Sequence, residues 1–295
     1  MKNTIQILSL FVFCIIFNDL SAQSRELLGK AWELKKELHL ADKASENLKS
    51  FNADLTECLK KIKELESKYY SQSSDEYLSI KLKKEILKLY DIKHALVADV
   101  KKIAIANKDE AFFLDLMQHI RPKDLREFLK QSTLSDSHRS FYEHWLERIK
   151  YTEEGTQLKN FALRDQQGKS IDTKEIHGKT LWIDSWASKC GPCIKKLKQM
   201  KPLYSKLKDK GFVVLAVSWD YSKTGVIKSL DDAKNDWNKV INKQGFNWLN
   251  VFDEGDKIME GQFGSTGKNL LVSSNGIILG YDLSVFEVEE ILMGE

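Results

Sequence analysis

The sequence predicts a chain of two parts, an all-α domain over residues 23–150 followed by a layered α/β domain over residues 151–295. Three observations lead to this prediction. Only 3 prolines and 15 glycines interrupt 295 residues rich in Lys, Leu and Glu, so much of the chain should be helical. Before residue 150 the apolar residues recur at steps of three and four, which is typical of amphipathic helices. After residues 151–156 short apolar runs alternate with helical segments, and this alternation favours a sheet covered by helices.

The first 22 residues have the pattern of a secretory signal peptide. Lys2 precedes an apolar run over residues 7–17, and Ala22 provides the small residue that a signal peptidase needs. The run is shorter than the ~20 residues of a membrane-spanning helix, which makes a retained anchor the weaker alternative. A lipid anchor would need a cysteine after the cleavage site, where Gln23 stands. We therefore expect an exported, periplasmic protein without stable membrane insertion.

The helical domain should begin with a hairpin of two antiparallel helices. The apolar stripe of the first helix consists of Leu48, Phe51, Leu55, Cys58, Ile62, Leu65 and Tyr69. Ser73 and Glu76 are spaced as a capping box for the second helix. One side of that helix carries Ile80, Leu87, Tyr90, His94 and Val97, and is widened by Leu82, Ile86 and Leu89. Two more amphipathic helices are expected over residues 111–117 and 140–146.

Charge and histidine placement argue against two classes of partner. The chain has 46 Lys and Arg against 43 Asp and Glu, mixed throughout, and lacks the clustered basic face that binds nucleic acid. His94 and His144 have no Cys, His or carboxylate at ligand spacing, so they are expected to be satisfied or exposed rather than metal ligands. We therefore expect no nucleic acid and no metal.

In the α/β domain, buried strands are expected over residues 180–186, 213–217, 248–251 and 270–272. Cys190 and Cys193 follow the first strand and open a helix. The unpaired N–H groups and dipole of a helix start favour a thiolate at Cys190, and Lys189 adds a positive charge. Pro192 suits the first turn, where its missing N–H would have no partner.

Two other interpretations of the cysteine pair are weaker. A single CxxC is a poor zinc signal without a second pair or histidines. A four-residue loop constrains little chain, so an inert structural disulfide is equally disfavoured. Cys58 makes the number of cysteines after the signal peptide odd, which excludes a framework of paired bridges; its place on the apolar stripe suggests a small buried hydrophobe.

The run Trp-Ala-Ser-Lys-Cys-Gly-Pro-Cys over residues 186–193 resembles the active-site motif of the thioredoxin superfamily, specifically the exported TlpA/ResA-like thiol–disulfide oxidoreductases. Residues 161–165 and 168–169 resemble the opening hairpin of that domain, residues 210–218 its second core strand, and residues 275–276 the turn joining its last two strands. The resemblance implies a thioredoxin-like α/β/α sandwich. The helical residues before it loosely resemble the spacer found in many exported proteins of Bacteroidetes.

The resemblance also implies a set of site residues. Cys190 and Cys193 would be catalytic, with Asp184 as the buried acid beneath the second cysteine. A carboxylate inside an apolar strand is costly unless it is used or paired, and burial should raise its pKa, so we favour proton transfer over a purely structural role. The substrate-binding residues would be Trp186, Lys189, Gly191, Pro192, Thr266 and Gly267.

The sequence departs from the family at the position that normally holds a cis-proline facing the cysteines. Gly267 stands there, preceded by Thr266, and no proline occurs after Pro202. A non-proline cis bond costs about 3 kcal/mol, so we expect a trans bond and a differently shaped loop. Lys189 and Lys196 replace the Trp and Glu that are common in relatives.

These observations predict a thiol–disulfide oxidoreductase without a cofactor, which acts on protein substrates with disulfides or thiols. An unidentified redox donor would restore its cysteine pair to the starting redox state. The resemblance to thioredoxin, which also has Gly-Pro between its cysteines, implies that the protein acts as a reductase. A peroxiredoxin-type peroxidase lacks support, because the Pro and Thr that precede the peroxidatic cysteine are absent. The alternative from another class is a non-catalytic binding or metal-handling module, since loss of the cis-proline would expose the thiols to metal.

Overall fold

The computed structural model describes residues 46–71, 76–106, 120–221, 229–254, 258 and 267–293. These residues form two compact units that divide between residues 143 and 144. The expected signal peptide, the proposed cap at Ser73 and the expected helix over residues 111–117 lie outside the described part of the chain. Among the described helices, none is both long enough and apolar enough to cross a membrane.

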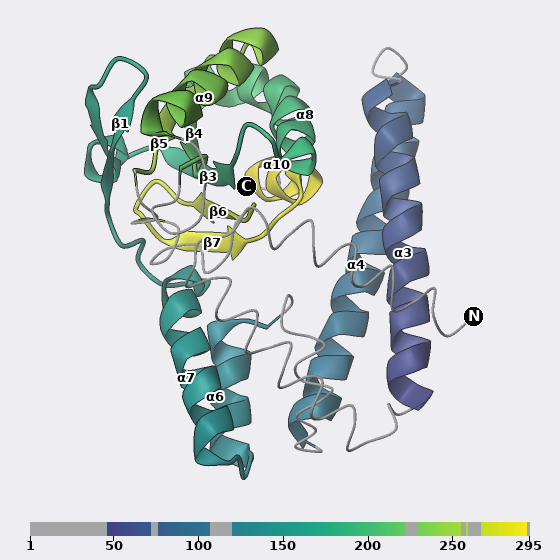
Figure 1. Cartoon of the computed structure of the whole chain (residues 1–295). Coiled ribbons are helices and arrows are strands. Elements are labelled where there is room, and N and C mark those ends of the chain that lie inside the picture. Colours follow the sequence, from purple (N-terminus) through teal and green to yellow (C-terminus); the bar gives the residue numbers. More distant parts are fainter. Residues whose placement is uncertain are drawn as a thin grey trace. The chain divides into compact units, whose positions relative to one another are not determined.

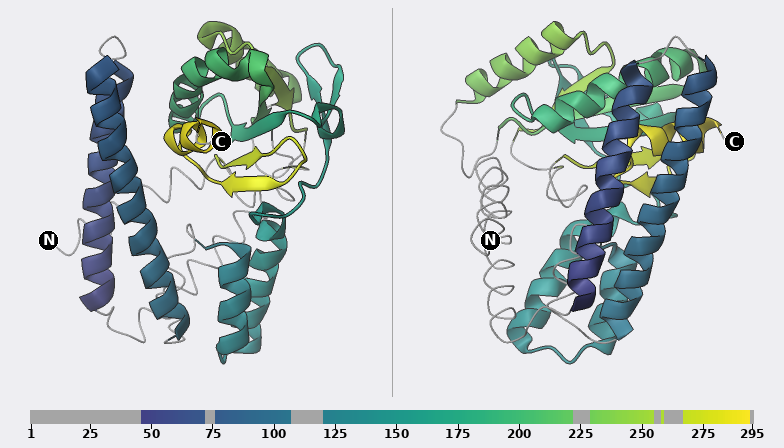
Figure 2. Two further views of the ribbon diagram at one scale, coloured as in Figure 1. Left: turned by 180° about the vertical axis from the view of Figure 1, so that it is seen from behind. Right: turned by 90° about the vertical axis from the view of Figure 1, so that its right-hand side faces the viewer.

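The first unit begins with two long helices, α3 (Glu46–Ser71) and α4 (Glu76–Ala106), which lie side by side in both views of Figure 2. The predicted stripe of α3 is confirmed at its centre, where Leu55, Cys58 and Ile62 are buried. The Cys58 thiol donates a hydrogen bond to the Leu89 carbonyl oxygen of α4 at 3.3 Å. The predicted hairpin is therefore present.

The expected apolar side of α4 is partly wrong. Ile80 is 51% exposed and His94 is exposed. Leu82 and Ile86, which were expected only to widen the stripe, are instead buried. Ile86 is fully buried at the centre, and the other buried positions of α4 are Leu82, Tyr90 and Val97. Successive steps of four residues from Leu82 through Ile86 to Tyr90 keep to one face of a helix, and this face contacts α3.

The helices α6 (Pro122–Gln131) and α7 (Asp136–Ile149) follow, and α7 contains the helix predicted over residues 140–146. Phe128 and Tyr142 pack edge to face with their ring centroids 5.4 Å apart. Asp124 caps α6 by accepting a hydrogen bond from the Arg121 amide at 2.9 Å, and it forms an ion pair with Lys101 of α4 at 2.7 Å. α7 leads into a short 3-10 helix, η2 (Lys150–Thr152).

The second unit is built on a seven-stranded mixed sheet in the order β2-β1-β5-β4-β3-β6-β7 (Figure 1). β3, β4 and β5 are parallel, and the remaining pairings are antiparallel. The strands are β1 (Ala162–Asp165), β2 (Ser170–Asp172), β3 (Thr180–Trp186), β4 (Phe212–Ser218), β5 (Leu249–Phe252), β6 (Asn269–Val272) and β7 (Ile278–Tyr281). The opening hairpin, the four predicted buried strands and the turn at residues 275–276 are thus confirmed.

Alternation along β3 sends neighbouring side chains into two different cores. Trp182 and Trp186 face one core, which also receives side chains from the helices α8 (Gly191–Leu207), α9 (Leu230–Gln244) and α10 (Val285–Met293). Leu181 and Ile183 face the other, with Leu163 of β1 and Ile176 of the 3-10 helix η3 (Thr173–Ile176). A third 3-10 helix, η4 (Lys208–Lys210), follows α8. The predicted fold class, an α/β domain preceded by helices, is confirmed.

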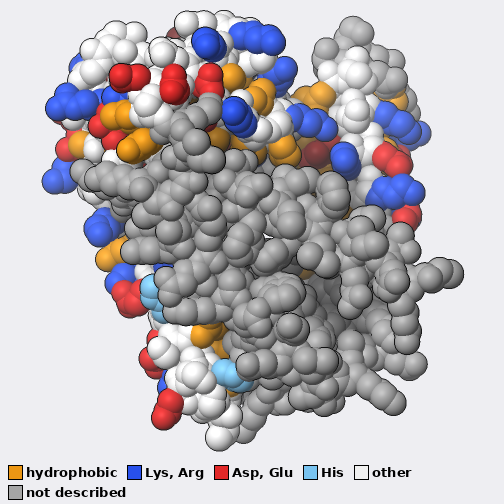
Figure 3. Space-filling view, viewed as in Figure 1, with side chains coloured by type: hydrophobic (Ala, Val, Ile, Leu, Met, Phe, Trp, Pro, Cys, Tyr) orange, Lys and Arg blue, Asp and Glu red, His pale blue; other side chains and the backbone are white. Residues whose placement is uncertain are grey.

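The described surface carries charges of both signs. Lys and Arg side chains are interspersed with Asp and Glu side chains on the face shown in Figure 3, as the even charge balance of the sequence suggests.

Candidate active site

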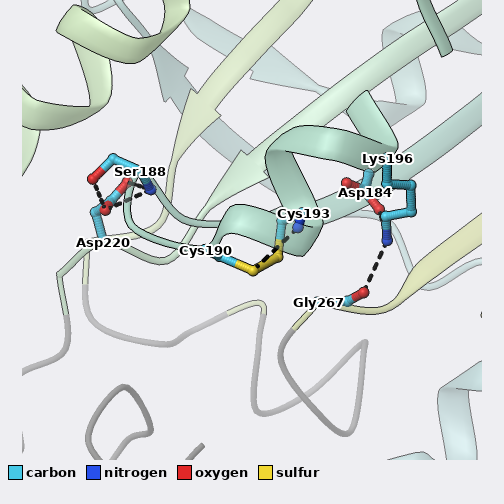
Figure 4. Close-up of a disulfide and its surroundings, with 7 residues drawn as sticks. All are labelled: Asp184, Ser188, Cys190, Cys193, Lys196, Asp220 and Gly267. Carbon is cyan, nitrogen blue, oxygen red and sulfur yellow. Dashed lines mark hydrogen bonds and ion pairs between the residues drawn. A yellow bond between two sulfur atoms is a disulfide. The ribbon is translucent and has the colours of Figure 1, made fainter. Parts of the chain in front are cut away.

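Cys190 and Cys193 form a disulfide at the start of α8, with their Cα atoms 5.3 Å apart (Figure 4). Cys190 is the N-cap residue, and its sulfur accepts a hydrogen bond from the Cys193 amide at 3.3 Å. Pro192 lies in the first turn, as predicted. The sulfur of Cys190 therefore occupies the place where a helix N-terminus stabilises negative charge.

The two cysteines differ in their exposure to solvent. Cys193 is only 4% exposed and belongs to the core under α8, whereas Cys190 is half-buried. Lys189, Gly191 and Pro192 are exposed beside it. A partner that approaches the helix start would consequently reach Cys190 before Cys193.

The turn that precedes Cys190 is fixed by Asp220, which lies just after β4. The Asp220 carboxylate accepts hydrogen bonds from the Ser188 amide at 2.9 and 3.0 Å and from the Ser188 hydroxyl at 2.5 Å. The Ser218 hydroxyl donates to the same carboxylate at 2.8 Å. Because β3 and β4 are parallel neighbours, both segments leave the sheet at the same edge. Asp220 was not singled out from the sequence, although an acid directly after a strand is a signal that could have indicated it.

Asp184 lies inside β3, between β4 and β6, and is completely buried. Its Oδ1 forms an ion pair with Lys196 Nζ at 2.5 Å. The short contact and the opposite charges make Lys196 the partner that favours the ionised form of Asp184. Burial raises the pKa of Asp184 to about 7, against the opposing effect of Lys196, and the negative charge of Asp282 adds to the rise. The predicted upward shift of this pKa thus has a structural cause.

Gly267 lies against the disulfide on the side away from Ser188 and Asp220 (Figure 4). A Cβ at this position would be 3.7 Å from Cys193 Sγ. The backbone φ of +74° is one that proline, fixed near −65°, cannot adopt. The loop is therefore shaped differently from one built around proline, as predicted. Thr266, its expected partner in substrate binding, lies outside the described residues.

Trp186 requires a correction. Its side chain has no exposed area and packs edge to face on Phe246, with the ring centroids 5.9 Å apart. The position follows from period-two alternation, which puts Trp186 on the same face of β3 as Trp182. Such a side chain offers no surface to a substrate, so its position supports a packing role beneath the site.

Lys196 was recognised in the sequence only as a departure from relatives, but it connects two parts of the site. Besides its ion pair with Asp184, its Nζ donates a hydrogen bond to the Gly267 carbonyl oxygen at 2.8 Å. Figure 4 shows Asp184, Lys196 and Gly267 on one side of the disulfide, and Ser188 with Asp220 on the other. No group of three or more metal-ligating side chains occurs among the described residues.

Comparisons with known proteins agree with this geometry. Residues 153–287 match the Redoxin family. Thiol-disulfide oxidoreductase ResA of Bacillus thuringiensis is 32% identical over 105 residues, covering 36% of this chain and 54% of that protein. ResA of Halalkalibacterium halodurans is 30% identical over 114 residues, covering 39% of this chain and 62% of that protein. The chain therefore spans little more than half the length of the curated relatives it matches.

A solved thioredoxin-like protein from Bacteroides caccae has a similar fold, with a TM-score of 0.54 and 17% identity over 70% of this chain and 83% of that chain. This likeness concerns the fold, and the sequence match covers the sheet and the disulfide at the start of α8. Residues 153–287 are thus similar to the Redoxin family, and part of this domain is similar to the thiol-disulfide oxidoreductases named ResA.

Proposed function

We propose that this protein is an extracytoplasmic thiol–disulfide oxidoreductase that reduces disulfides in protein substrates. The observation that carries the proposal is the asymmetric cysteine pair, in which half-buried Cys190 caps α8 and buried Cys193 lies behind it. In such an arrangement the exposed sulfur can attack a substrate disulfide, and the buried sulfur can then resolve the mixed disulfide. The relatives named ResA support the same chemistry.

In the reduced protein, the Cys190 thiolate attacks one sulfur of a substrate disulfide. A mixed disulfide forms, and the other substrate sulfur leaves as a thiolate that takes a proton from water. Cys193 then transfers its proton to the Asp184 carboxylate and attacks the Cys190 sulfur. The second substrate thiolate leaves, and the Cys190–Cys193 disulfide is formed. Two electrons have passed to the substrate, and a dithiol donor must supply them again.

Asp184 suits the role of proton acceptor because its pKa of about 7 leaves both of its forms populated near neutral pH. A group with an ordinary carboxyl pKa would be a much weaker base for a thiol. Gly191 and Pro192 are exposed beside Cys190, and we assign them, with Lys189 and the Gly267 loop, to the surface that a substrate contacts. The signal-peptide pattern of residues 1–22 supports an extracytoplasmic, periplasmic location.

The test is reduction of a protein disulfide with dithiothreitol as the electron source. The wild type should accelerate reduction, and Cys190→Ala should abolish the acceleration. Cys193→Ala should instead accumulate a mixed disulfide with the substrate, visible by mass spectrometry, because the resolving thiol is absent. A wild type no faster than Cys190→Ala would refute the oxidoreductase function; stoichiometric metal bound through the two cysteines would favour a metal-handling module.

A further inference from the structure

We infer that Lys196 is a positioning residue, which holds the backbone of Gly267 and Lys268 (the Gly267 loop) against the cysteine pair and couples it to the buried Asp184. One ammonium group contacts the Asp184 carboxylate at 2.5 Å and the Gly267 carbonyl oxygen at 2.8 Å. The two partners come from β3 and from the chain just before β6. Lys196 itself comes from the first turns of α8, one helical turn after Cys193.

The loop needs such a contact because its backbone is not restrained by a ring. A glycine at φ +74° is the least restricted residue that could occupy this position, and a Cβ added to it would lie 3.7 Å from Cys193 Sγ. The Lys196 ammonium therefore supplies by hydrogen bonding and charge a restraint that proline would supply covalently. Lys196 is well placed for this, because its side chain is only 18% exposed and the contact is shielded from water.

Further contacts hold the chain on the far side of Gly267. The Lys268 carbonyl oxygen accepts a hydrogen bond from the Ser185 amide at 2.9 Å, and the Lys268 ammonium forms an ion pair with Asp282. Loss of the Lys196 contact would leave Gly267 without this restraint, while Lys268 keeps its own. The Ser185 amide is thus the nearest backbone reporter of whether the loop is docked on β3.

The coupling to Asp184 follows from the sharing of a single ammonium group. When Asp184 is ionised, it attracts Lys196 into the position from which Lys196 also reaches Gly267. When Asp184 is protonated, this attraction is lost and the loop is held less firmly. By linkage, a docked loop must in turn favour the ionised form of Asp184. The charged groups around Asp184 are Lys196 from α8, Asp282 after β7, and Lys268, which is paired with Asp282.

The test compares Lys196→Met, Lys196→Gln and Lys196→Arg with a control, Lys198→Met, which makes the same substitution at an exposed position of α8. Amide hydrogen exchange is measured by NMR on the disulfide form, with the Val214 amide of β4 as an internal reference for global stability. Lys196→Met should speed exchange at Ser185 by about tenfold relative to Val214, while Lys196→Arg and Lys198→Met should change it less than about twofold. Equal acceleration at Ser185 and Val214 would mean a merely structural role and overturn the inference.

A second measurement follows the ionisation of Asp184 rather than the docking of the Gly267 loop. The titration of the Asp184 carboxyl is read from its ¹³C chemical shift. Lys196→Gln should raise the midpoint by about one pH unit or more because the neighbouring cation is gone, and Lys198→Met should leave it unchanged. An unchanged midpoint in Lys196→Gln would overturn the coupling.

The inference rests on the proposed function only where it treats Cys193 as the resolving thiol. Both measurements use the oxidised protein and require no turnover. An inactive wild type with the expected exchange and titration results would refute the proposed function alone, whereas an active wild type without them would refute the role of Lys196 alone.

Discussion

Replacing Asp184 with Asn should change how the stability of the oxidised protein depends on pH. Asn has nearly the same shape but cannot ionise, so the substitution removes one titration while retaining the packing of β3. In the disulfide form neither Cys190 nor Cys193 titrates. The substitution therefore changes the titration of the Asp184 carboxyl and not that of the cysteines. The wild type and the variant therefore differ in a single protonation equilibrium.

The magnitude follows from the pKa of Asp184, which is 3.8 as a reference value and about 7 in the folded protein. The folded state thus binds this proton more tightly than the unfolded state does. Its stabilising effect is complete below about pH 4, is lost as the pH rises from about 4 to 7, and stays lost above that range. At about 1.4 kcal/mol per pKa unit, the wild type should lose up to about 4 kcal/mol relative to the variant.

The assay is urea denaturation, followed by tryptophan fluorescence, at intervals between pH 4 and pH 8.5. Subtracting the free energy of unfolding of Asp184→Asn from that of the wild type cancels all other titrating groups. The difference should fall steadily between about pH 4 and pH 7 and then become constant. A difference that is independent of pH, or that rises over this range, would refute the assignment of a raised pKa and with it the proton-acceptor role.

After reduction, iodoacetamide should modify Cys190 well before Cys193, because Cys193 is only 4% exposed; equal rates in a mass-spectrometric time course would contradict the asymmetry. Gly267→Pro should lower the free energy of unfolding by about 1–3 kcal/mol, because proline cannot adopt a φ of +74°; higher stability in the same urea assay would show that the loop adapts. Cys58→Ala should cost about 1 kcal/mol of stability and leave disulfide reduction unchanged, because the substitution removes only a small buried group from the contact between α3 and α4. Loss of activity, or of a covalent dimer on non-reducing gels, would give Cys58 a redox role.

The elements that depend on local sequence patterns could be predicted. The strand, the cysteine pair and the helix that follow one another over residues 180–207 are recognisable because periodicity, helix-start chemistry and the CxxC spacing all act within a few residues. The upward pKa shift of Asp184 was also predictable, since a carboxyl in the middle of an apolar strand must be desolvated. In both cases short-range information is sufficient.

Contacts between distant segments could not be predicted in the same way. Lys196 and Gly267 are 71 positions apart, and Ser188 and Asp220 are 32 apart, so neither pairing leaves a local pattern. The substrate role expected for Trp186 failed for a different reason. The motif around Trp186 suggests contact with a substrate. The alternation of side chains along β3, however, already places the Trp186 side chain on the buried face.

The burial of Cys58 between α3 and α4 has a consequence for oxidative folding. In an unfolded chain, Cys58, Cys190 and Cys193 could pair in three ways. Closing the short loop between Cys190 and Cys193 costs about 3 kcal/mol less chain entropy than closing a loop of about 130 residues to Cys58. Once the hairpin has formed, the Cys58 thiol is shielded and its pKa is raised by burial, so little thiolate is available for exchange. The cysteine pair can then cycle between its oxidised and reduced states without scrambling to the third thiol of the same chain.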